Sequence, residues 1–255
     1  MRYGLIGGKL GHSYSKYIHE RMVEGQYDLI PLNEDEFHVF MKLKEFTGIN
    51  VTIPYKEKVI PYLDHIDPLA RKIGAVNTIV NNKGRLTGYN TDFYGLLHLF
   101  NSNSIKAEQK KCLVLGAGGT SKTAQAVLEK LGAGEIKIVS RSPICDKQIT
   151  YEECYDRHSD AGVIVNTTPV GMYPNTDATP LDLVGFTQCI ALVDVIFNPI
   201  ETKLTKQAKN LGIPAVTGLP MLVAQAKQAE EYFRCIKLDD CIIDMITQEL
   251  LEGIQ

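Results

Sequence analysis

The segment LVLGAGGTSK, residues 113–122, places a glycine-rich turn between two different apolar patterns. Cys112 to Leu115, at its start, form a short continuous apolar run, which is typical of a buried strand. After the turn, residues 124–131 carry apolar side chains at helical spacing, and a second strand-like run covers Ile136 to Ser140. The order strand, tight turn, helix, strand predicts a βαβ unit of a parallel sheet.

The glycines of this turn suit a phosphate group. Gly116 allows the sharp change of direction. The missing side chain at Gly118 lets a pyrophosphate approach the backbone N–H groups at the positive end of the helix. Ser121 stands where the full GxGxxG pattern has its third glycine, so a turn that merely joins strand to helix is the alternative. The placement between strand and helix favours dinucleotide binding.

The end of the second strand indicates which dinucleotide is bound. A NAD site is expected to show an acidic residue there, but this sequence reads Ser140-Arg141-Ser142. An arginine with flanking hydroxyls can hold a 2′-phosphate by charge-assisted hydrogen bonds, whereas a carboxylate would repel it. The tripeptide therefore favours NADP, and a solvated loop cation is the alternative reading of Arg141.

Further strand-like runs surround this unit. The runs at 163–166, 191–195 and 215–217 complete an open, doubly wound parallel sheet. Towards the N-terminus, strands and helices alternate as in an α/β domain, and a hairpin turns at Asn81 to Gly84. The polar stretch Asn101 to Ser104 interrupts a helical pattern and predicts a domain boundary. The N-terminal strands are expected at 3–6, 28–32, 49–53, 76–80 and 85–89, and two closing helices within 221–251.

Composition excludes several classes of function. With 255 residues and 44% hydrophobic residues the chain can bury a sizeable core, and a net charge of −3 argues against nucleic acid as a partner. No apolar stretch approaches the roughly 20 residues that span a membrane, and the N-terminus lacks a signal peptide, so we expect a cytoplasmic protein. The six cysteines are scattered, which indicates neither a metal site nor a disulfide framework.

Three polar clusters lie where the alternation of strands and helices breaks. Ser13 and Ser15 precede a helix, where capping would occupy at most one hydroxyl. Lys56 follows Thr52 across a proline, and an isolated loop lysine is usually only solvated. Asn77 lies at the end of a strand-like run. Asp92 lies just before a helix, and a role as the N-cap of that helix would explain it equally well. Each cluster taken singly has this ordinary explanation.

Together, these clusters resemble the signature blocks of the shikimate dehydrogenase family, in the family's order. The resemblance covers essentially the whole chain, and several independent blocks in order are far more specific than any one of them. The matching blocks are GHSYS at 11–15 with His19, NVTIPYK at 50–56, GAVNT at 74–78, NTD at 90–92, GAGG at 116–119, NTTPVGM at 166–172 and GLPMLVAQ at 218–225.

The resemblance implies an α/β enzyme of two lobes that interconverts 3-dehydroshikimate and shikimate with NADPH. Residues 1–100, completed by the helices of 221–255, would form the substrate lobe, and residues 101–220 a Rossmann-like, doubly wound NADP lobe. The catalytic pair would be Lys56 and Asp92. Residues that would bind the substrate, besides this pair, are Ser13, Ser15, Thr52, Asn77, Gln225 and Phe197. Residues that would bind NADP are Gly116, Ala117, Gly118, Gly119, Thr120, Ser140, Arg141, Ser142, Thr167, Val195, Gly218 and Met221.

The chemistry of the pair agrees with that role. A hydride that arrives at a carbonyl carbon leaves an alkoxide, which a lysine ammonium can stabilise and protonate. In the block DVIFNP at 194–199, Phe197 stands where the family often offers the substrate a tyrosine hydroxyl, so the hydrogen bond from that hydroxyl is not expected here. The loop after Arg141 also lacks the second arginine that is common there, with only Lys147 nearby.

Two alternatives stay open at this point. A quinate or dual quinate/shikimate dehydrogenase that uses NAD would share the fold and the blocks. A sensor of dinucleotide or shikimate without turnover would share them too, although it has no need for a proton donor such as Lys56. The substrate is a small molecule in each case, and the sequence leaves monomer and homodimer open.

Overall fold

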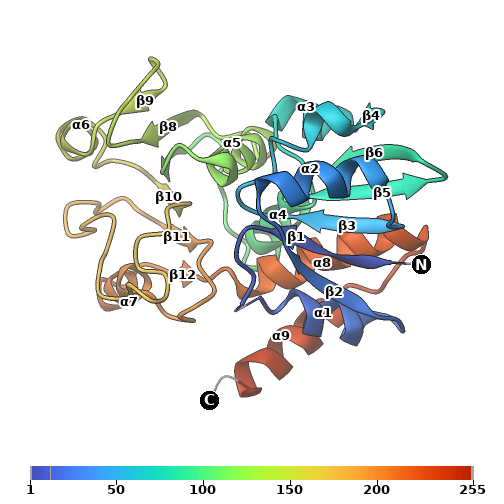
Figure 1. Cartoon of the computed structure of the whole chain (residues 1–255). Coiled ribbons are helices and arrows are strands. Elements are labelled where there is room, and N and C mark those ends of the chain that lie inside the picture. Colours follow the sequence, from blue (N-terminus) through green and yellow to red (C-terminus); the bar gives the residue numbers. More distant parts are fainter. Residues whose placement is uncertain (1, 12, 254–255) are drawn as a thin grey trace. The chain divides into compact units, whose positions relative to one another are not determined.

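A computed structural model describes residues 2–11 and 13–253 of the chain, so that His12 of the first block lies outside the described residues. The chain divides into two compact units (Figure 1). Unit 1 comprises residues 1–95 and 223–255, and unit 2 comprises residues 96–222. The division falls between Gly95 and Leu96, earlier than the polar stretch at 101–104 where we expected it. That stretch instead ends a helix: Ser102 Oγ and Asn103 Nδ2 donate to the carbonyls of the preceding turn.

Unit 1 is built on a six-stranded mixed sheet with the order β2-β1-β3-β5-β6-β4. Strand β1 pairs in parallel with β2 and β3, whereas β5 pairs antiparallel with β3 and β6. The strands are β1 Tyr3–Gly7, β2 Tyr27–Pro31, β3 Gly48–Val51, β4 His65–Ile66, β5 Thr78–Asn82 and β6 Arg85–Tyr89. The helices are α1 Ser15–Met22, α2 Glu34–Leu43, the 3-10 turn Ile60–Tyr62, α3 Pro68–Ile73, the start of α4 Asp92–Ser102, most of α8 Leu219–Arg234, and α9 Cys241–Gly253.

The two faces of this sheet have different partners. Alternate residues of a strand point to opposite faces, so Ile6 and Leu5 lie on different sides. Ile6 belongs to a core with Phe37 of α2 and Ala70 of α3. Leu5 belongs to a second core with Phe233 of α8. Figure 1 shows α2 and α3 on one side of the sheet and α1 and α8 on the other.

Gly48 explains how closely α8 approaches its face of the sheet. A Cβ at Gly48 would lie only 2.3 Å from the Phe233 ring. Only a residue without a side chain leaves room for that ring, so this glycine lets the helix rest on strand β3. The same face carries Tyr27 and Asn50, since both are in register with residues of β1 that contact α8.

Unit 2 contains a second six-stranded sheet, and neighbouring strands of this sheet pair in parallel. The order is β12-β11-β10-β7-β8-β9. In chain order within the unit this is the doubly wound 3-2-1-4-5-6 arrangement, whose strand order reverses between β7 and β10. The predicted Rossmann-like fold is therefore confirmed. Its elements are β7 Lys111–Leu115, α5 Gly119–Lys130, β8 Glu135–Val139, β9 Gln148–Ile149, α6 Tyr151–Arg157, β10 Val163–Asn166, β11 Ala191–Asp194, α7 Lys203–Asn210 and β12 Ala215–Val216.

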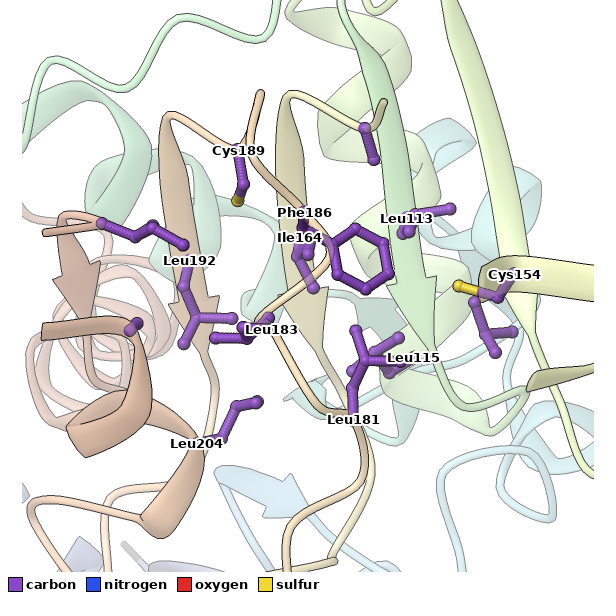
Figure 2. Close-up of a cluster of buried hydrophobic side chains, with 14 of the residues drawn as sticks. Leu113, Leu115, Cys154, Ile164, Leu181, Leu183, Phe186, Cys189, Leu192 and Leu204 are labelled. Atoms are coloured by element: carbon purple, nitrogen blue, oxygen red, sulfur yellow. The ribbon is translucent and has the colours of Figure 1, made fainter. Parts of the chain in front are cut away.

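One face of this sheet is covered in an unusual way. The connection from β10 to β11 contains no helix, and its apolar residues Leu181, Leu183 and Phe186 are buried instead. They belong to one core with Leu113 of β7 and Leu192 of β11 (Figure 2). Burial of each such side chain contributes about 1.5–3 kcal/mol. The loop thus does the packing that a crossover helix does elsewhere.

All six cysteines are free thiols. Burial raises the pKa of the Cys112 thiol to about 12, so this group behaves as an apolar core atom.

Among the residues that the structure describes, no helix has the length and the apolar character needed to cross a membrane.

Candidate active site

The shortest contact between polar groups in the predicted site joins Lys56 and Asp92. Lys56 Nζ lies 2.6 Å from Asp92 Oδ2, and the two side chains are 21% and 13% exposed. The backbone of Lys56 is held as well, because its carbonyl accepts a hydrogen bond from Val76 N at 2.9 Å. Lys56 is therefore held both at its backbone and at its ammonium, and its side chain is partly exposed.

Asp92 is the first residue of α4, but it does not do the capping that the sequence left open for it. Asn90 Oδ1 accepts a hydrogen bond from Phe93 N at 3.1 Å, which is the bond that caps this helix. The carboxylate of Asp92 is thereby left for Lys56. The interpretation of Asp92 as a plain N-cap is wrong.

Asn77 and Gln225 are brought together through Thr91. Asn77 Oδ1 accepts from Thr91 N at 2.7 Å, and Asn77 Nδ2 donates to Thr91 Oγ1 at 3.0 Å. Thr91 Oγ1 also lies 3.3 Å from Gln225 Oε1. Asn77 stands just before β5 rather than within it, since that strand begins at Thr78. Two predicted substrate residues, far apart in the chain, thus share one buried neighbour.

Ser13 and Ser15 occupy the start of α1. Ser13 Oγ accepts a hydrogen bond from Ser15 N at 3.2 Å, whereas the N-cap of α1 is Tyr14, which makes no side-chain capping bond. Ser15 is buried, while Ser13 is partly exposed. No hydrogen bond among the described residues joins either serine to Lys56 or Asp92. Each serine hydroxyl keeps the ability to donate to a ligand.

Thr52 lies just beyond β3, which ends one residue earlier at Val51. Its N–H still donates to Ile6 O at 2.9 Å, and its carbonyl accepts from Tyr55 N. A Cβ at Gly7 would lie 2.5 Å from the Thr52 methyl carbon. Gly7 therefore leaves the space in which the Thr52 side chain packs.

In unit 2 the glycine-rich turn stands at the carboxyl end of β7, as expected. Gly116 has φ +97, a conformation that favours glycine, and a Cβ there would lie 3.3 Å from Thr167 Oγ1. Thr167 follows β10, and its hydroxyl donates to Leu115 O at 2.7 Å. Gly116 and Thr167 thus meet where the strand order reverses, which is the usual ligand position in such sheets.

The N-terminus of α5 is open. Its N-cap is Gly118, which offers no side-chain hydrogen bond to the helix. A Cβ at Gly118 or Gly119 would meet nothing within 4 Å. Ala117 is exposed, and Thr120 is partly exposed. The first N–H groups of this helix are therefore accessible to an anion.

Ser140, Arg141 and Ser142 follow β8 directly. Ser140 Oγ accepts from Ser142 N at 3.2 Å, which folds the tripeptide into a tight turn. Arg141 and Ser142 are exposed. A guanidinium and hydroxyls on an exposed turn at this strand end suit a phosphate ester.

Gly218 and Val195 pack backbone against backbone. A Cβ at Gly218 would lie 2.0 Å from the carbonyl oxygen of Val195, and Gly218 N donates to Ile196 O at 2.9 Å. Met221, three residues on in α8, is buried. Phe197 follows the same loop and is partly buried. Val195 and Phe197 thus lie on the loop after β11, Gly218 lies on the loop after β12, and Met221 lies in the first turn of α8.

The structure also shows residues to which the sequence assigned no role. Thr91, Thr78 and Asn50 are buried and hydrogen-bonded around Asn77. All three lie inside the quoted blocks NTD, GAVNT and NVTIPYK, which was the available signal. His19 of the first block is also buried, and its Nδ1 lies 2.6 Å from Glu230 Oε1.

Comparisons with known proteins agree with this arrangement. A sequence profile of the shikimate dehydrogenase substrate binding domain matches residues 5–79. A relative from Clostridium beijerinckii named shikimate dehydrogenase (NADP(+)) is 41% identical over 254 residues, which cover 93% of each chain. The chain is thus similar to that protein along nearly its whole length.

Solved structures show the same likeness. The fusion protein of chorismate mutase and shikimate 5-dehydrogenase from Clostridium acetobutylicum superposes with a TM-score of 0.92 at 37% identity, covering 99% of this chain and 97% of that one. Shikimate 5-dehydrogenase from Thermus thermophilus, in complex with NADP(H) and shikimate, gives 0.87 at 29% identity, covering 98% and 99%. With a 41% identical relative matched over nearly its full length, the chain belongs to the shikimate dehydrogenase family.

Proposed function

We propose that this protein catalyses the reversible, NADP-dependent reduction of 3-dehydroshikimate to shikimate. The observation that carries the proposal is the pair Lys56 and Asp92, joined at 2.6 Å beside buried amide and hydroxyl groups of the same unit. Family membership supports the substrate and the cofactor, because one relative is named shikimate dehydrogenase (NADP(+)) and one similar structure is in complex with NADP(H) and shikimate.

Lys56 acts as the proton donor in the direction of reduction. NADPH, when bound, supplies a hydride to the carbonyl carbon of the substrate. Lys56 Nζ gives a proton to the carbonyl oxygen, so that one hydride and one proton complete the hydroxyl. In the reverse direction the same nitrogen takes the proton back. The charge of the ammonium stabilises the oxygen while negative charge develops on it.

Asp92 holds Lys56 in place. Its carboxylate accepts the hydrogen bond from Lys56 Nζ, and its second oxygen can accept from a substrate hydroxyl. A lysine side chain has several rotatable bonds, so this restraint keeps the ammonium near the reacting oxygen. We assign Asp92 as a partner of Lys56 and of a hydroxyl, rather than as an independent acid.

The remaining polar groups of unit 1 recognise the substrate. Ser13 and Ser15 bind its carboxylate, and Thr52, Asn77 and Gln225 bind its hydroxyls. Hydroxyl and amide groups suit a polyol because each can donate and accept, and a buried partner left unpaired penalises a ligand that lacks the matching hydroxyl. Phe197 offers this polyol an apolar edge instead of a hydroxyl.

The residues of unit 2 fit a nicotinamide dinucleotide phosphate. The fit rests on the open N-terminus of α5 and on the empty space beside Gly118 and Gly119. Gly116 to Thr120 would hold the pyrophosphate on backbone N–H groups. Ser140, Arg141 and Ser142 would hold the 2′-phosphate. Thr167, Val195, Gly218 and Met221 would line the nicotinamide side.

A crossed assay tests the proposal. Purified protein is given shikimate or quinate with NADP or NAD, and the formation of the reduced cofactor is followed by its absorbance. We expect the highest kcat/KM for shikimate with NADP. A higher value for quinate with NAD would assign the protein to the quinate dehydrogenases, and no turnover with any pair would favour a sensor.

Two further properties stay proposals. We propose that the enzyme works in the cytoplasm and as a monomer or homodimer. Light scattering coupled to gel filtration measures its mass in solution. Fractionation of cells that produce it measures where it resides.

A further inference from the structure

A chain of buried hydrogen bonds runs through unit 1 and ends at Gln225. Tyr27 Oη donates to Asn50 Oδ1 at 2.7 Å, and Asn50 Nδ2 donates to Thr78 Oγ1 at 2.9 Å. Thr78 Oγ1 lies 3.0 Å from Thr91 Oγ1, which in turn lies 3.3 Å from Gln225 Oε1. Each of these five residues is at most 8% exposed.

The contacts of this chain allow its hydrogen bonds to share one direction. Burial raises the pKa of Tyr27 well above its ordinary value, so its hydroxyl stays a donor. Asn50 Nδ2 also faces the carbonyl of Asn77, which fixes which end of the Asn50 amide carries the hydrogens. Thr78 therefore accepts from Asn50 and can pass its own hydrogen to Thr91. The Thr91 hydroxyl can then donate to Gln225 Oε1 or to Asn77 Oδ1, which lies 3.2 Å away. Bonds aligned along such a chain strengthen one another.

Thr91 also determines how Asn77 is oriented. Its backbone N–H donates to Asn77 Oδ1 at 2.7 Å, and its hydroxyl oxygen accepts from Asn77 Nδ2 at 3.0 Å. A flipped Asn77 amide would place its nitrogen against that N–H and lose the bond from Thr91 N. In this orientation one hydrogen of Asn77 Nδ2 has no partner within the described part of the chain. Asn77 therefore offers a ligand a donor, not an acceptor.

We propose that Thr91 is a positioning residue that orients the amides of Asn77 and Gln225 for substrate binding. The inference rests on the proposed function, since it takes these two amides as substrate-binding groups. Thr91 is wholly buried, with 0% of its surface exposed, so it acts through its neighbours. Thr91 also precedes Asp92 directly. These two neighbouring residues thus contact three groups of the proposed site, namely the amides of Asn77 and Gln225 and the ammonium of Lys56.

The hydroxyl of Thr91 is removed at nearly constant shape in Thr91→Val. We expect the KM for shikimate to rise about tenfold, the size of one lost hydrogen bond to a ligand. The KM for NADP should stay within about twofold. Thr91→Ser keeps the hydroxyl and should recover most of the wild-type KM. An unchanged KM for shikimate in folded Thr91→Val would overturn the proposal.

Thr205→Val is the matched control. Thr205 is also a fully buried threonine with a bonded hydroxyl, but it lies in unit 2 on α7. We expect Thr205→Val to lower the stability of the protein without changing the KM for shikimate. If Thr205→Val raised this KM as much as Thr91→Val does, the loss of any buried hydroxyl would have the same effect, and the specific role of Thr91 would be contradicted. If Thr91→Val does not fold, Thr91→Cys replaces the hydroxyl by a weak donor of similar size, and it too must raise that KM.

A second measurement needs no substrate. The side-chain amide protons of Asn77, assigned by comparison with Asn77→Asp, should exchange slowly with solvent in the wild type and at least tenfold faster in Thr91→Val or Thr91→Cys. Equal exchange rates would overturn the positioning role. If the wild type shows slow exchange and no turnover of shikimate, the proposed function fails while the orientation of Asn77 by Thr91 stands.

Discussion

Lys56 Nζ and Asp92 Oδ2 lie 2.6 Å apart, although the two residues are 36 positions apart in the chain. Lys56→Met keeps much of the length of the side chain and removes the ammonium. We expect kcat to fall by about 10²–10⁴-fold, with a much smaller change in the KM for shikimate, because the proton donor is needed mostly in the transition state. Steady-state kinetics of the purified variant measures both constants.

Lys58 supplies the control for this substitution. It lies in the same loop and pairs with the exposed Glu34 instead of a site residue. Lys58→Met should retain the wild-type kcat. A Lys56→Met enzyme with unaltered kcat would remove Lys56 from the chemistry and favour a sensor without turnover.

Removal of the Asp92 charge should have a smaller effect. Asp92→Asn keeps the shape of the side chain and leaves the helix cap untouched, because Asn90 supplies the capping bond. We expect kcat to fall about tenfold to a hundredfold, as Lys56 loses its restraint but keeps its proton. The same assay on Asp64→Asn, which weakens the pair of Asp64 with Lys44 at 3.5 Å, should show wild-type kcat. Wild-type turnover in Asp92→Asn would contradict its role as the partner of Lys56.

Much of the fold could be predicted because its strands carry clear apolar patterns. The run from Val163 to Asn166 was predicted with the bounds that the structure has. Strands β4 and β9 have only two residues each and were not predicted, whereas β12, which is equally short, was predicted at 215–217. The predicted strands at 49–53 and 76–80 are shifted by one or two residues. Thr52 and Asn77 are thereby placed just outside the strands, where their side chains are not required for the sheet.

The proposed site could be predicted only in part. Lys56 and Asp92 acquired meaning from the order of the blocks around them, since each alone has an ordinary explanation. Only the structure shows the hydrogen bond between them. Only the structure shows, too, that Asn90 caps the helix, so that Asp92 does not. The block NTD marked the position of Thr91, but its proposed role as a positioning residue could not be read from the sequence. A buried hydroxyl has no period or spacing of its own, because its partners come from distant segments.

Arg141 should decide the preference between the two dinucleotides. If its guanidinium holds the 2′-phosphate, Arg141→Ala loses a charge-assisted hydrogen bond and the KM for NADP rises about tenfold to a hundredfold. The KM for NAD, which has no such phosphate, should stay unchanged. Arg157→Ala is the control, because Arg157 is an exposed arginine of α6 that pairs with Glu153. A parallel rise for NADP and NAD in Arg141→Ala would contradict the assignment.

Gly218→Ala tests the contact between the loops after β11 and β12. The new Cβ would lie 2.0 Å from Val195 O, so one backbone segment must move. We expect a loss of about 1–3 kcal/mol in the free energy of unfolding and weaker binding of NADP. Urea unfolding and titration with NADP measure the two effects. Gly185→Ala is the control, because a Cβ at Gly185, also in unit 2, would meet nothing within 4 Å. We expect its free energy of unfolding and its affinity for NADP to stay close to those of the wild type.

Glu230 makes the stability of unit 1 depend on pH. Its carboxylate accepts from His19 Nδ1 at 2.6 Å and from Arg234 Nε at 2.7 Å. Burial alone would raise the pKa of Glu230, but the hydrogen bonds and charges of His19 and Arg234 outweigh it and hold the pKa below its ordinary value. An acid with a lowered pKa in the folded state stabilises that state above its ordinary pKa. This contribution is lost as the pH falls through the ordinary glutamate range to the lowered pKa.

Glu230→Gln should therefore cost about 3–5 kcal/mol in the free energy of unfolding at neutral pH, as it leaves the partners of a buried pair without their charge. The difference from wild type should shrink as the pH falls below the ordinary glutamate range, because protonation removes the same charge from the wild type. Urea unfolding of both proteins across acidic and neutral pH measures this convergence. Glu24 is exposed, and Glu24→Gln should have the same free energy of unfolding as the wild type at every pH. If the loss of free energy of unfolding in Glu230→Gln stayed constant with pH, packing rather than charge would be its cause.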